Sequence, residues 1–287
     1  MSEIRSPSAS RAAALYAAGL GDGAGSAQRF LLSHFSIPNA RPLLGFLLPL
    51  FLLLAWTASA HFGWLPEQIL PAPEIVWISL RDYAQDGGLW SDSFISLQRV
   101  LRGFALGAGI GLALGAGMAL SRGLKALADP VFLAVSQVPI VGWIPLLILL
   151  IGIDEGLKTL IIALASFIPV TLGTYQGIRD VPARYREVGR VFLLSPAETL
   201  RHIVLPAAAP AIFTGLREAA ANAWQTLIAV ELLASTEGLG YLMAYGRQLF
   251  QLELVLTAVV AIGAIGFLTD WLLGRVARYL QRWELRG

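Results

Sequence analysis

Residues 103–120 read GFALGAGIGLALGAGMAL, an apolar run in which glycine returns at every fourth position, at Gly103, Gly107, Gly111 and Gly115. Between Arg102 and Arg122 lie 19 residues without Asp, Glu, Lys or Arg, close to the roughly 20 apolar residues that a helix needs to cross a bilayer core. In lipid, small residues four positions apart let two helix backbones approach closely. The stretch therefore predicts a membrane-spanning helix whose glycine face packs against its own subunit, with a dimer seam as the alternative.

The whole chain has the composition of a membrane protein. Of its 287 residues, 56% are hydrophobic and 14% are charged, against about 45–50% and about 25% in a soluble domain. Gaps between charged residues and apolar runs predict an all-α integral membrane fold with six transmembrane helices, at about residues 43–61, 97–121, 130–151, 158–178, 208–234 and 252–274. An even number of spans would place both chain ends on the same side of the membrane.

The distribution of Lys and Arg indicates which side that is. With the N-terminus inside, 16 of the 21 basic residues fall on inner segments, and cytoplasmic loops carry an excess of Lys and Arg. We therefore expect an N-in/C-in arrangement, with a Gly/Ser/Ala-rich cytoplasmic tail at residues 1–42, a six-helix membrane domain at 43–283 and a cytoplasmic end at 284–287. The tail does not read as a signal peptide, because its first apolar run comes late and is long enough to span.

Several kinds of chemistry have no support in the sequence. The chain has no cysteine, which excludes disulfides, thiolate metal sites and cysteine nucleophiles. Three scattered histidines predict no metal site, and no hydrolase motif or G-x-x-x-x-G-K-[ST] phosphate loop occurs. The net charge of +2 does not indicate nucleic acid. We therefore expect no catalytic residue, no metal and no cofactor bound by this chain.

Residues 179–206 form the one long polar loop inside the membrane domain, and the pattern predicts two short helices. Ser195, Pro196 and Glu198 give the second helix an N-cap, a proline at its first position and the acidic residue of a capping box. We expect this helix to end before Pro206. A polar, well-capped hairpin suits docking into a soluble partner, and a simple solvated connection is the alternative.

Polar residues and prolines within the spans mark a candidate pathway. Pro139, Pro145 and Pro169 each remove a backbone hydrogen bond that lipid cannot replace, so these breaks should face protein or water. The first candidate lining is therefore Ser136–Pro145, with Gln137, Pro139 and Trp143. A kinked packing helix without substrate contact is the alternative.

The fifth span adds a polar face with Asn222, Gln225 and Thr226, followed by Glu231. An ionised group at membrane depth costs about 2.5–3.5 kcal/mol on insertion scales and usually faces a cavity or a partner. We expect Glu231 either to gate the outer end of the path or to bond to the backbone near Gly238–Gly240. Arg217 is expected to be structural, with Asp270 pairing either with it or with Arg275.

The polar loop also resembles a known motif. Glu187-Val188-Gly189, three residues, Leu193, nine residues and Ile203-Val204-Leu205-Pro206 resemble the Glu-Ala-Ala loop of bacterial ABC importer permeases. That loop reads Glu-Ala-Ala, three residues, Gly, nine residues, Ile-x-Leu-Pro. Here Val188 and Gly189 replace the two alanines, and Leu193 replaces the loop glycine. The resemblance implies that the loop couples the chain to an ATPase, with an altered turn and Leu193 as a packing contact.

Stretches such as SLQRVLRGFALG, DPVFLAVSQVP and EGLGYL over about residues 43–283 resemble the subfamily that imports aliphatic sulfonates, taurine and nitrate. This resemblance implies the type I ABC importer permease fold, a bacterial inner membrane, two permease copies in a homodimer, and an extracytoplasmic binding protein that delivers the anion. Separate ATPase subunits would bind ATP and Mg. The alternatives from other classes are a secondary carrier or channel that works without an ATPase, and a membrane anchor for a soluble complex.

Overall fold

The computed structural model of the protein describes residues 41–280, with side chains placed from 46 to 278, and these residues fold into helices and connecting turns without a strand. The chain divides into two units at Phe62. In the first unit, the described part is the apolar helix α2 (Arg41–His61), with Pro49 in its interior. The predicted tail and the predicted C-terminal segment lie largely outside the described residues.

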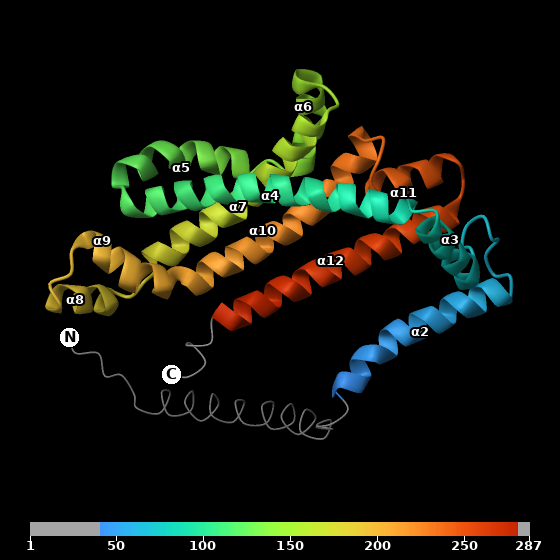
Figure 1. Ribbon diagram of the computed structural model, residues 1–287, viewed down its shortest axis with the longest axis horizontal. Helices are drawn as coiled ribbons and strands as arrows, with labels where there is room; N and C mark the ends of the chain where they lie inside the picture. Colours follow the sequence, from blue (N-terminus) through green and yellow to red (C-terminus); the bar gives the residue numbers. More distant parts are fainter. Residues whose placement is uncertain (1–40, 281–287) are drawn as a thin grey trace, which may run out of the picture. The chain divides into compact units, whose positions relative to one another are not determined.

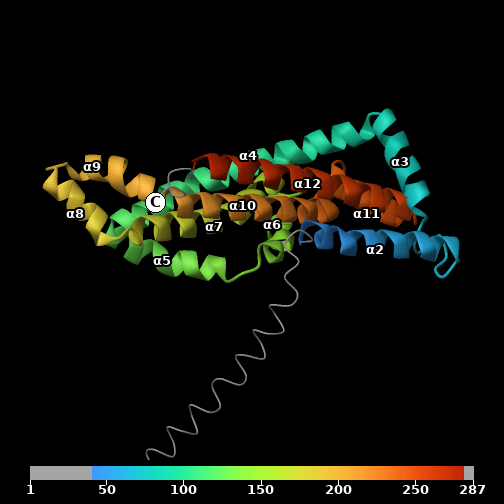
Figure 2. The ribbon, with the colours of Figure 1, turned by 90° about the horizontal axis from the view of Figure 1, so that it is seen from below.

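The second unit is a set of long helices with short helices at their ends (Figure 1, Figure 2). In chain order its helices are α3 (Pro73–Gln85), α4 (Gly88–Leu120), α5 (Arg122–Ser136), η1 (Ile140–Trp143), α6 (Ile144–Ile151), α7 (Glu155–Arg179), α8 (Ala183–Val191), α9 (Pro196–Thr199), η2 (Leu200–Val204), α10 (Leu205–Ala234), α11 (Leu239–Gln248) and α12 (Leu252–Leu280). Within this unit α8 and α9 lie at one end of the long helices, and α3 and α11 lie at the other.

Helix α7 is the most enclosed of the long helices, because α4 packs on one side of it and α10 on the other. The glycine stripe of α4 forms the first contact. A methyl group added at Gly103 would lie 2.6 Å from Cβ of Ile162, and one at Gly115 would lie 2.5 Å from the carbonyl oxygen of Thr171. These distances leave no room for a side chain, so the structure places the stripe against α7 of the same chain.

A second close approach joins α7 to α10. A methyl group added at Gly173 would lie 2.9 Å from Cα of Gly215. Between these contacts, buried Ile162, Ala223 and Leu227 form part of the apolar core. Small residues thus bring three helices together along most of their length, as helix packing in lipid requires.

Four helical stretches among the described residues are long and apolar enough to cross a membrane, namely α4, α7, residues 196–234 and α12. The stretch predicted as the third span at 130–151, with a break at Pro139, is a helix pair, Arg122–Ser136 and Ile140–Ile151, bent by 87°. Pro139 stands at the break, where its fixed φ and missing N–H end the helix. Pro169, by contrast, lies inside an unbroken α7 and is buried, so it faces protein as expected.

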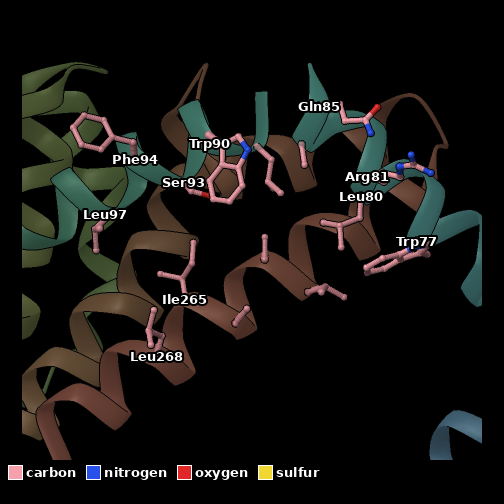
Figure 3. Close-up of a pocket in the computed structure, with 15 residues that line it drawn as sticks. Trp77, Leu80, Arg81, Gln85, Trp90, Ser93, Phe94, Leu97, Ile265 and Leu268 are labelled. Atoms are coloured by element: carbon pink, nitrogen blue, oxygen red, sulfur yellow. The ribbon is translucent and has the colours of Figure 1, made fainter. Parts of the chain in front are cut away.

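An apolar groove of about 950 Å³ lies between α3, α4 and α12. Figure 3 shows Trp77 and Arg81 on α3, Trp90 and Phe94 on α4, and Ile265 on α12 around it. Trp77 and Trp90 are each about two-thirds exposed, at 66% and 69%. Such aromatic residues are typical of the interface between a membrane and water.

Candidate functional site

The polar loop folds into a hairpin of α8, α9 and η2, which we call the coupling hairpin (residues 183–204). Helix α8 ends in two backbone hydrogen bonds, from the Leu194 N–H to the Gly189 carbonyl at 2.9 Å and from the Leu193 N–H to the Arg190 carbonyl at 3.1 Å. This is the Schellman pattern, in which the residue after the cap adopts a left-handed conformation. Leu193 does so, with φ of 53°.

Leu193 therefore makes the turn for which glycine is preferred. The expectation of an altered turn was wrong, because the left-handed geometry is kept despite the β-carbon. The Leu193 side chain is 91% exposed, so it contacts little within its own chain and is free to contact a partner.

Gly189 holds the two arms of the coupling hairpin together. It is buried, and a methyl group there would lie 2.9 Å from Oγ1 of Thr199 and 3.3 Å from Cδ1 of Ile203. Arg186 donates a hydrogen bond of 3.0 Å to the carbonyl of Ile178, at the end of α7. Glu187 and Val188 are exposed on α8, which leaves these two residues of the resemblance open to a partner.

The predicted capping box at Ser195 is confirmed. The Glu198 N–H donates to Oγ of Ser195 at 3.3 Å, and the Ser195 N–H donates to Oε2 of Glu198 at 2.8 Å. The predicted end of this helix before Pro206 was wrong. The chain passes through the π-helical turn η2 into α10, with Leu205 and Pro206 in the first turn of α10, and residues 196–234 form one helical stretch.

The helix continues through Pro206 because a proline in the first turn of a helix needs no N–H partner, and the wider π turn before it changes the backbone hydrogen bonding.

The two arms of the coupling hairpin leave hollows on both of its sides. One of about 390 Å³ is lined by Arg186, Arg190 and Pro196, and another of about 630 Å³ by Tyr185, Val188 and Pro206.

The structure brings most of the predicted path residues together in one groove of about 360 Å³ between η1, α7 and α10. Its lining includes the predicted residues Pro139, Asn222, Gln225 and Thr226, and adds Pro169 and Glu218. We call this the polar groove. Glu218, Asn222 and Gln225 follow one another at helical spacing, which is why they share a face of α10.

Three predicted path residues do not line the polar groove. Gln137 is exposed beside it. Trp143 is half-buried, and its indole N–H has no hydrogen-bond partner within the described residues. Glu231 is fully buried elsewhere, two turns further along α10.

Glu231 belongs to a buried set of bonded groups. Its carboxylate accepts hydrogen bonds from Nη1 of Arg99 at 2.8 Å, from Oγ of Ser96 at 2.9 Å and from the Gly240 N–H at 2.8 Å. Gly238 lies against it with φ of 102°, and a methyl group there would meet the Glu231 carboxylate. Of the two predicted roles, the bond to backbone beside Gly238–Gly240 matches this geometry.

Arg99 is the centre of this set. It is 2% exposed, and its Nη2 also donates to Glu155 at 2.6 Å and to Glu237 at 3.0 Å. Asp92 accepts hydrogen bonds from the Gly238 N–H at 3.0 Å and from the Tyr83 hydroxyl at 2.7 Å. We call these groups the Arg99 cluster (Asp92, Ser96, Arg99, Glu155, Glu231 and Glu237).

The Arg99 cluster joins α4, α7, α10 and the start of α11. A buried charge is tolerated when it is paired and hydrogen-bonded, and Arg99 satisfies its guanidinium with three carboxylates. We did not anticipate Asp92, Ser96 or Arg99 from the sequence. A signal was present, because these positions extend the glycine stripe of α4 at the same helical spacing and therefore face α7 and α10 too.

Asp270 pairs with Arg217, which was one of the two partners expected for it. Nε and Nη2 of Arg217 donate to the two carboxylate oxygens of Asp270 at 2.8 and 2.7 Å, linking α10 to α12. Arg275 instead lies over the ring of Trp271, 4.3 Å from its centroid. Within residues 41–280 there is no group of His, Cys, Asp and Glu suited to a metal ion.

Comparison with known proteins places these features in a family. Residues 107–282 match the family described as binding-protein-dependent transport system inner membrane component. The chain is 34% identical over 240 residues to the putative aliphatic sulfonates transport permease protein SsuC of Bacillus subtilis, covering 84% of this chain and 87% of that protein. It is 35% identical over 203 residues to the bicarbonate transport system permease protein CmpB of Synechococcus elongatus, covering 70% and 72%.

Solved structures are similar in fold. An inward-facing MetNI methionine ABC transporter chain matches with a TM-score of 0.53 and 15% identity, over 67% of this chain and 94% of that one. A chain of an amino acid ABC transporter matches with a TM-score of 0.53 and 18% identity, over 71% and 97%.

Proposed function

This chain belongs to the family of binding-protein-dependent transport system inner membrane components, and on that premise we propose that it forms the translocation pathway of an ATP-driven importer for a small anion. A permease of an ABC importer is a membrane component and not an enzyme; ATP is hydrolysed by a separate subunit. We propose two copies of this chain, ATPase subunits that hold ATP and Mg, and an extracytoplasmic binding protein that delivers the substrate.

One observation carries this proposal. The helical stretch of residues 196–234 begins in the coupling hairpin, carries Asn222, Gln225 and Thr226 in the polar groove, and ends with Glu231 in the Arg99 cluster. A displacement of the hairpin by a partner is therefore applied directly to the helix that lines the groove. A solvated connection between spans would not need this continuity.

The mechanism follows from that linkage. ATPase subunits that approach each other on binding ATP would move the two coupling hairpins, with Glu187 and Leu193 on their exposed side. The polar groove would then switch between openings to the two sides of the membrane. A partner can shift the polar groove from one state to the other only if it binds the two states with different affinity. The ATPase would bind them differently at the coupling hairpin.

The substrate is proposed to be an aliphatic sulfonate, taurine or nitrate-like anion, and the names of the sulfonate and bicarbonate relatives support a small anion. Glu218 faces the polar groove and has no ion pair within the described residues. A carboxylate there opposes an anion, and the same carboxylate of the second copy would add to that repulsion, so Glu218 would not itself bind the substrate.

We further propose six spans with both ends inside, in the inner membrane of a bacterium. Helix α2 would be the first span and the bent pair α5 and η1–α6 the third. The excess of Lys and Arg on the segments that share the N-terminal side supports this orientation. It places the coupling hairpin in the cytoplasm, where ATP is available.

The test is ATP hydrolysis by the chain reconstituted in liposomes with its ATPase and binding protein. We expect the binding protein to stimulate hydrolysis, and Glu187→Ala to lower the stimulated rate about tenfold, within the range of about 1–3 kcal/mol typical of coupling between sites. Glu74→Ala, an exposed glutamate on α3, is the matched control. Uptake into liposomes that contain no ATPase would overturn the proposal in favour of a secondary carrier or channel.

A further inference from the structure

Two residues other than glycine adopt a left-handed backbone within residues 41–280, Leu193 and Phe250. Phe250 follows the end of α11, with φ of 58°. The Gln251 N–H donates to the Gly246 carbonyl at 2.8 Å, and the Phe250 N–H donates to the Arg247 carbonyl at 3.3 Å. Helix α11 thus ends in the same Schellman cap as α8.

Both features of Phe250 act against stability. A β-carbon disfavours the left-handed conformation, so this cap position is usually glycine. The phenyl ring is also 87% exposed, so it gains little from burial within the chain. Residues held in a sparsely populated conformation cluster at functional sites, and a contact outside the chain would explain why a large apolar side chain stands here.

The surroundings of Phe250 are those of a contact between proteins. Leu249 and Tyr245 beside it are 48% and 42% exposed. Arg247, Gln248 and Gln251, which are close to these apolar residues in the sequence, are exposed and polar. An apolar centre with a polar rim, and aromatic and arginine side chains, is typical of a protein interface.

Phe250 is also connected to the site already described. Helix α11 begins at the Arg99 cluster, where the Gly238 N–H donates to Asp92 and the Leu239 N–H donates to Ser96 at 3.0 Å. In the second unit α11 lies at the end opposite to the coupling hairpin (Figure 1). A force applied at Phe250 would therefore act through one short helix on the bonded groups that hold Glu231 of α10.

We propose that Phe250 is the apolar anchor on which the extracytoplasmic binding protein docks, and that α11 carries this contact to the Arg99 cluster. The inference rests on the proposed function, which places α11 on the outer side of the membrane. It adds the residue that the partner contacts and the path by which that contact reaches the helix of the coupling hairpin. The chemistry recognised is a shallow apolar pocket with a polar rim on the binding protein.

The test is a titration of the binding protein against the complete transporter in lipid nanodiscs, with ATP hydrolysis as the readout. We expect Phe250→Ala and Phe250→Gly to raise the half-stimulating concentration of binding protein at least tenfold, which corresponds to about 1.4 kcal/mol. Hydrolysis without binding protein should stay unchanged. Phe94→Ala, another exposed phenylalanine at 64%, is the matched control and should leave the titration as in the wild type.

A second measurement separates a contact from a folding defect. Phe250→Gly should raise the melting temperature of the permease, because glycine adopts the left-handed conformation freely, while it weakens the response to binding protein. A variant that is more stable and yet less responsive supports the anchor.

Two results would overturn the role of Phe250 as an anchor, and a third would overturn the proposed function. Wild-type stimulation in both Phe250 variants would remove the anchor while leaving the proposed function intact. Variants that keep the titration but lose thermal stability only in the presence of lipid would place Phe250 in the bilayer. A wild-type complex that does not respond to binding protein at all would overturn the proposed function itself.

Discussion

The Arg99 cluster and the coupling hairpin lie at opposite ends of the long helices and are held together by opposite means. In the Arg99 cluster, the buried charges of Arg99 and Glu231, at 2% and 0% exposure, pair with each other, and the half-exposed Glu155 and Glu237 also bond to Arg99. In the coupling hairpin, exposed helices are held by caps and by the close packing of Gly189. One end therefore resists separation of its helices, and the other can follow a partner.

This difference suits a transporter driven from one side. A buried salt bridge is costly to break, because separation leaves an unpaired charge. The coupling hairpin is mostly exposed, and its apolar contact with the long helices is made by Leu200 and Val204. The helix of residues 196–234 joins the two ends. When the coupling hairpin moves, the Arg99 cluster would hold the other end of this helix in place, so the polar groove between them would change shape.

The largest expected effect is the loss of Arg99. Arg99→Ala would leave Glu231 buried without its cation, and removal of one partner of a buried pair costs roughly 3–5 kcal/mol. The thermal unfolding of the purified permease in detergent measures this loss. Arg217→Ala removes an ion pair whose partners are about half exposed, at 52% and 53%, and should cost roughly 0–1 kcal/mol. Equal losses of stability in Arg99→Ala and Arg217→Ala would contradict the contrast between a buried and an exposed ion pair.

A smaller loss is expected at Gly238, which closes the Arg99 cluster at the start of α11. Its φ of 102° and ψ of 170° belong to a region that only glycine adopts readily, and such strain costs of order 1–3 kcal/mol. Gly238→Ala would add a contact with Glu231 and Arg99. Gly263→Ala, where an added methyl group meets nothing within 4 Å, is the control, and thermal unfolding is again the measurement.

The smallest effect, of opposite sign, is expected in the coupling hairpin. Leu193→Gly should stabilise the turn by about 1 kcal/mol, because the left-handed conformation costs a residue with a β-carbon roughly 1–2 kcal/mol. Coupled ATP hydrolysis should fall at the same time, because the exposed side chain is lost from the docking surface. Hydrogen exchange of the hairpin amides and the stimulated ATPase rate report the two effects. A variant with full coupling would show that Leu193 contributes nothing to docking.

Local patterns in the sequence predicted what depends on neighbours along the chain. The capping box of Ser195 and Glu198 needs only four residues, and the glycine repeat of α4 needs only helical spacing. Both therefore follow from residue order. The partner of Asp270 was narrowed to Arg217 or Arg275, because a charged group beside a span usually has an oppositely charged partner within reach.

Features that depend on distant contacts were not predicted. Glu231 was identified as a residue that needs a partner, but its partner Arg99 lies 132 residues away along the chain, beyond the reach of a local pattern. The 87° bend at the expected Pro139 break and the continuity through Pro206 were also beyond local rules, since a proline ends a helix or begins one according to the backbone around it.

The sequence by itself determined that this chain is helical and that it lies in a membrane, because composition, charge distribution and helical period act within a few turns of chain. Only the tertiary structure decided which polar residues line a groove and which are bonded within the protein. The reason is that the free energy of a buried charge depends on the groups around it in space. Asn222 and Glu231 are nine residues apart on one helix, and only their neighbours from α4 and α7 distinguish them.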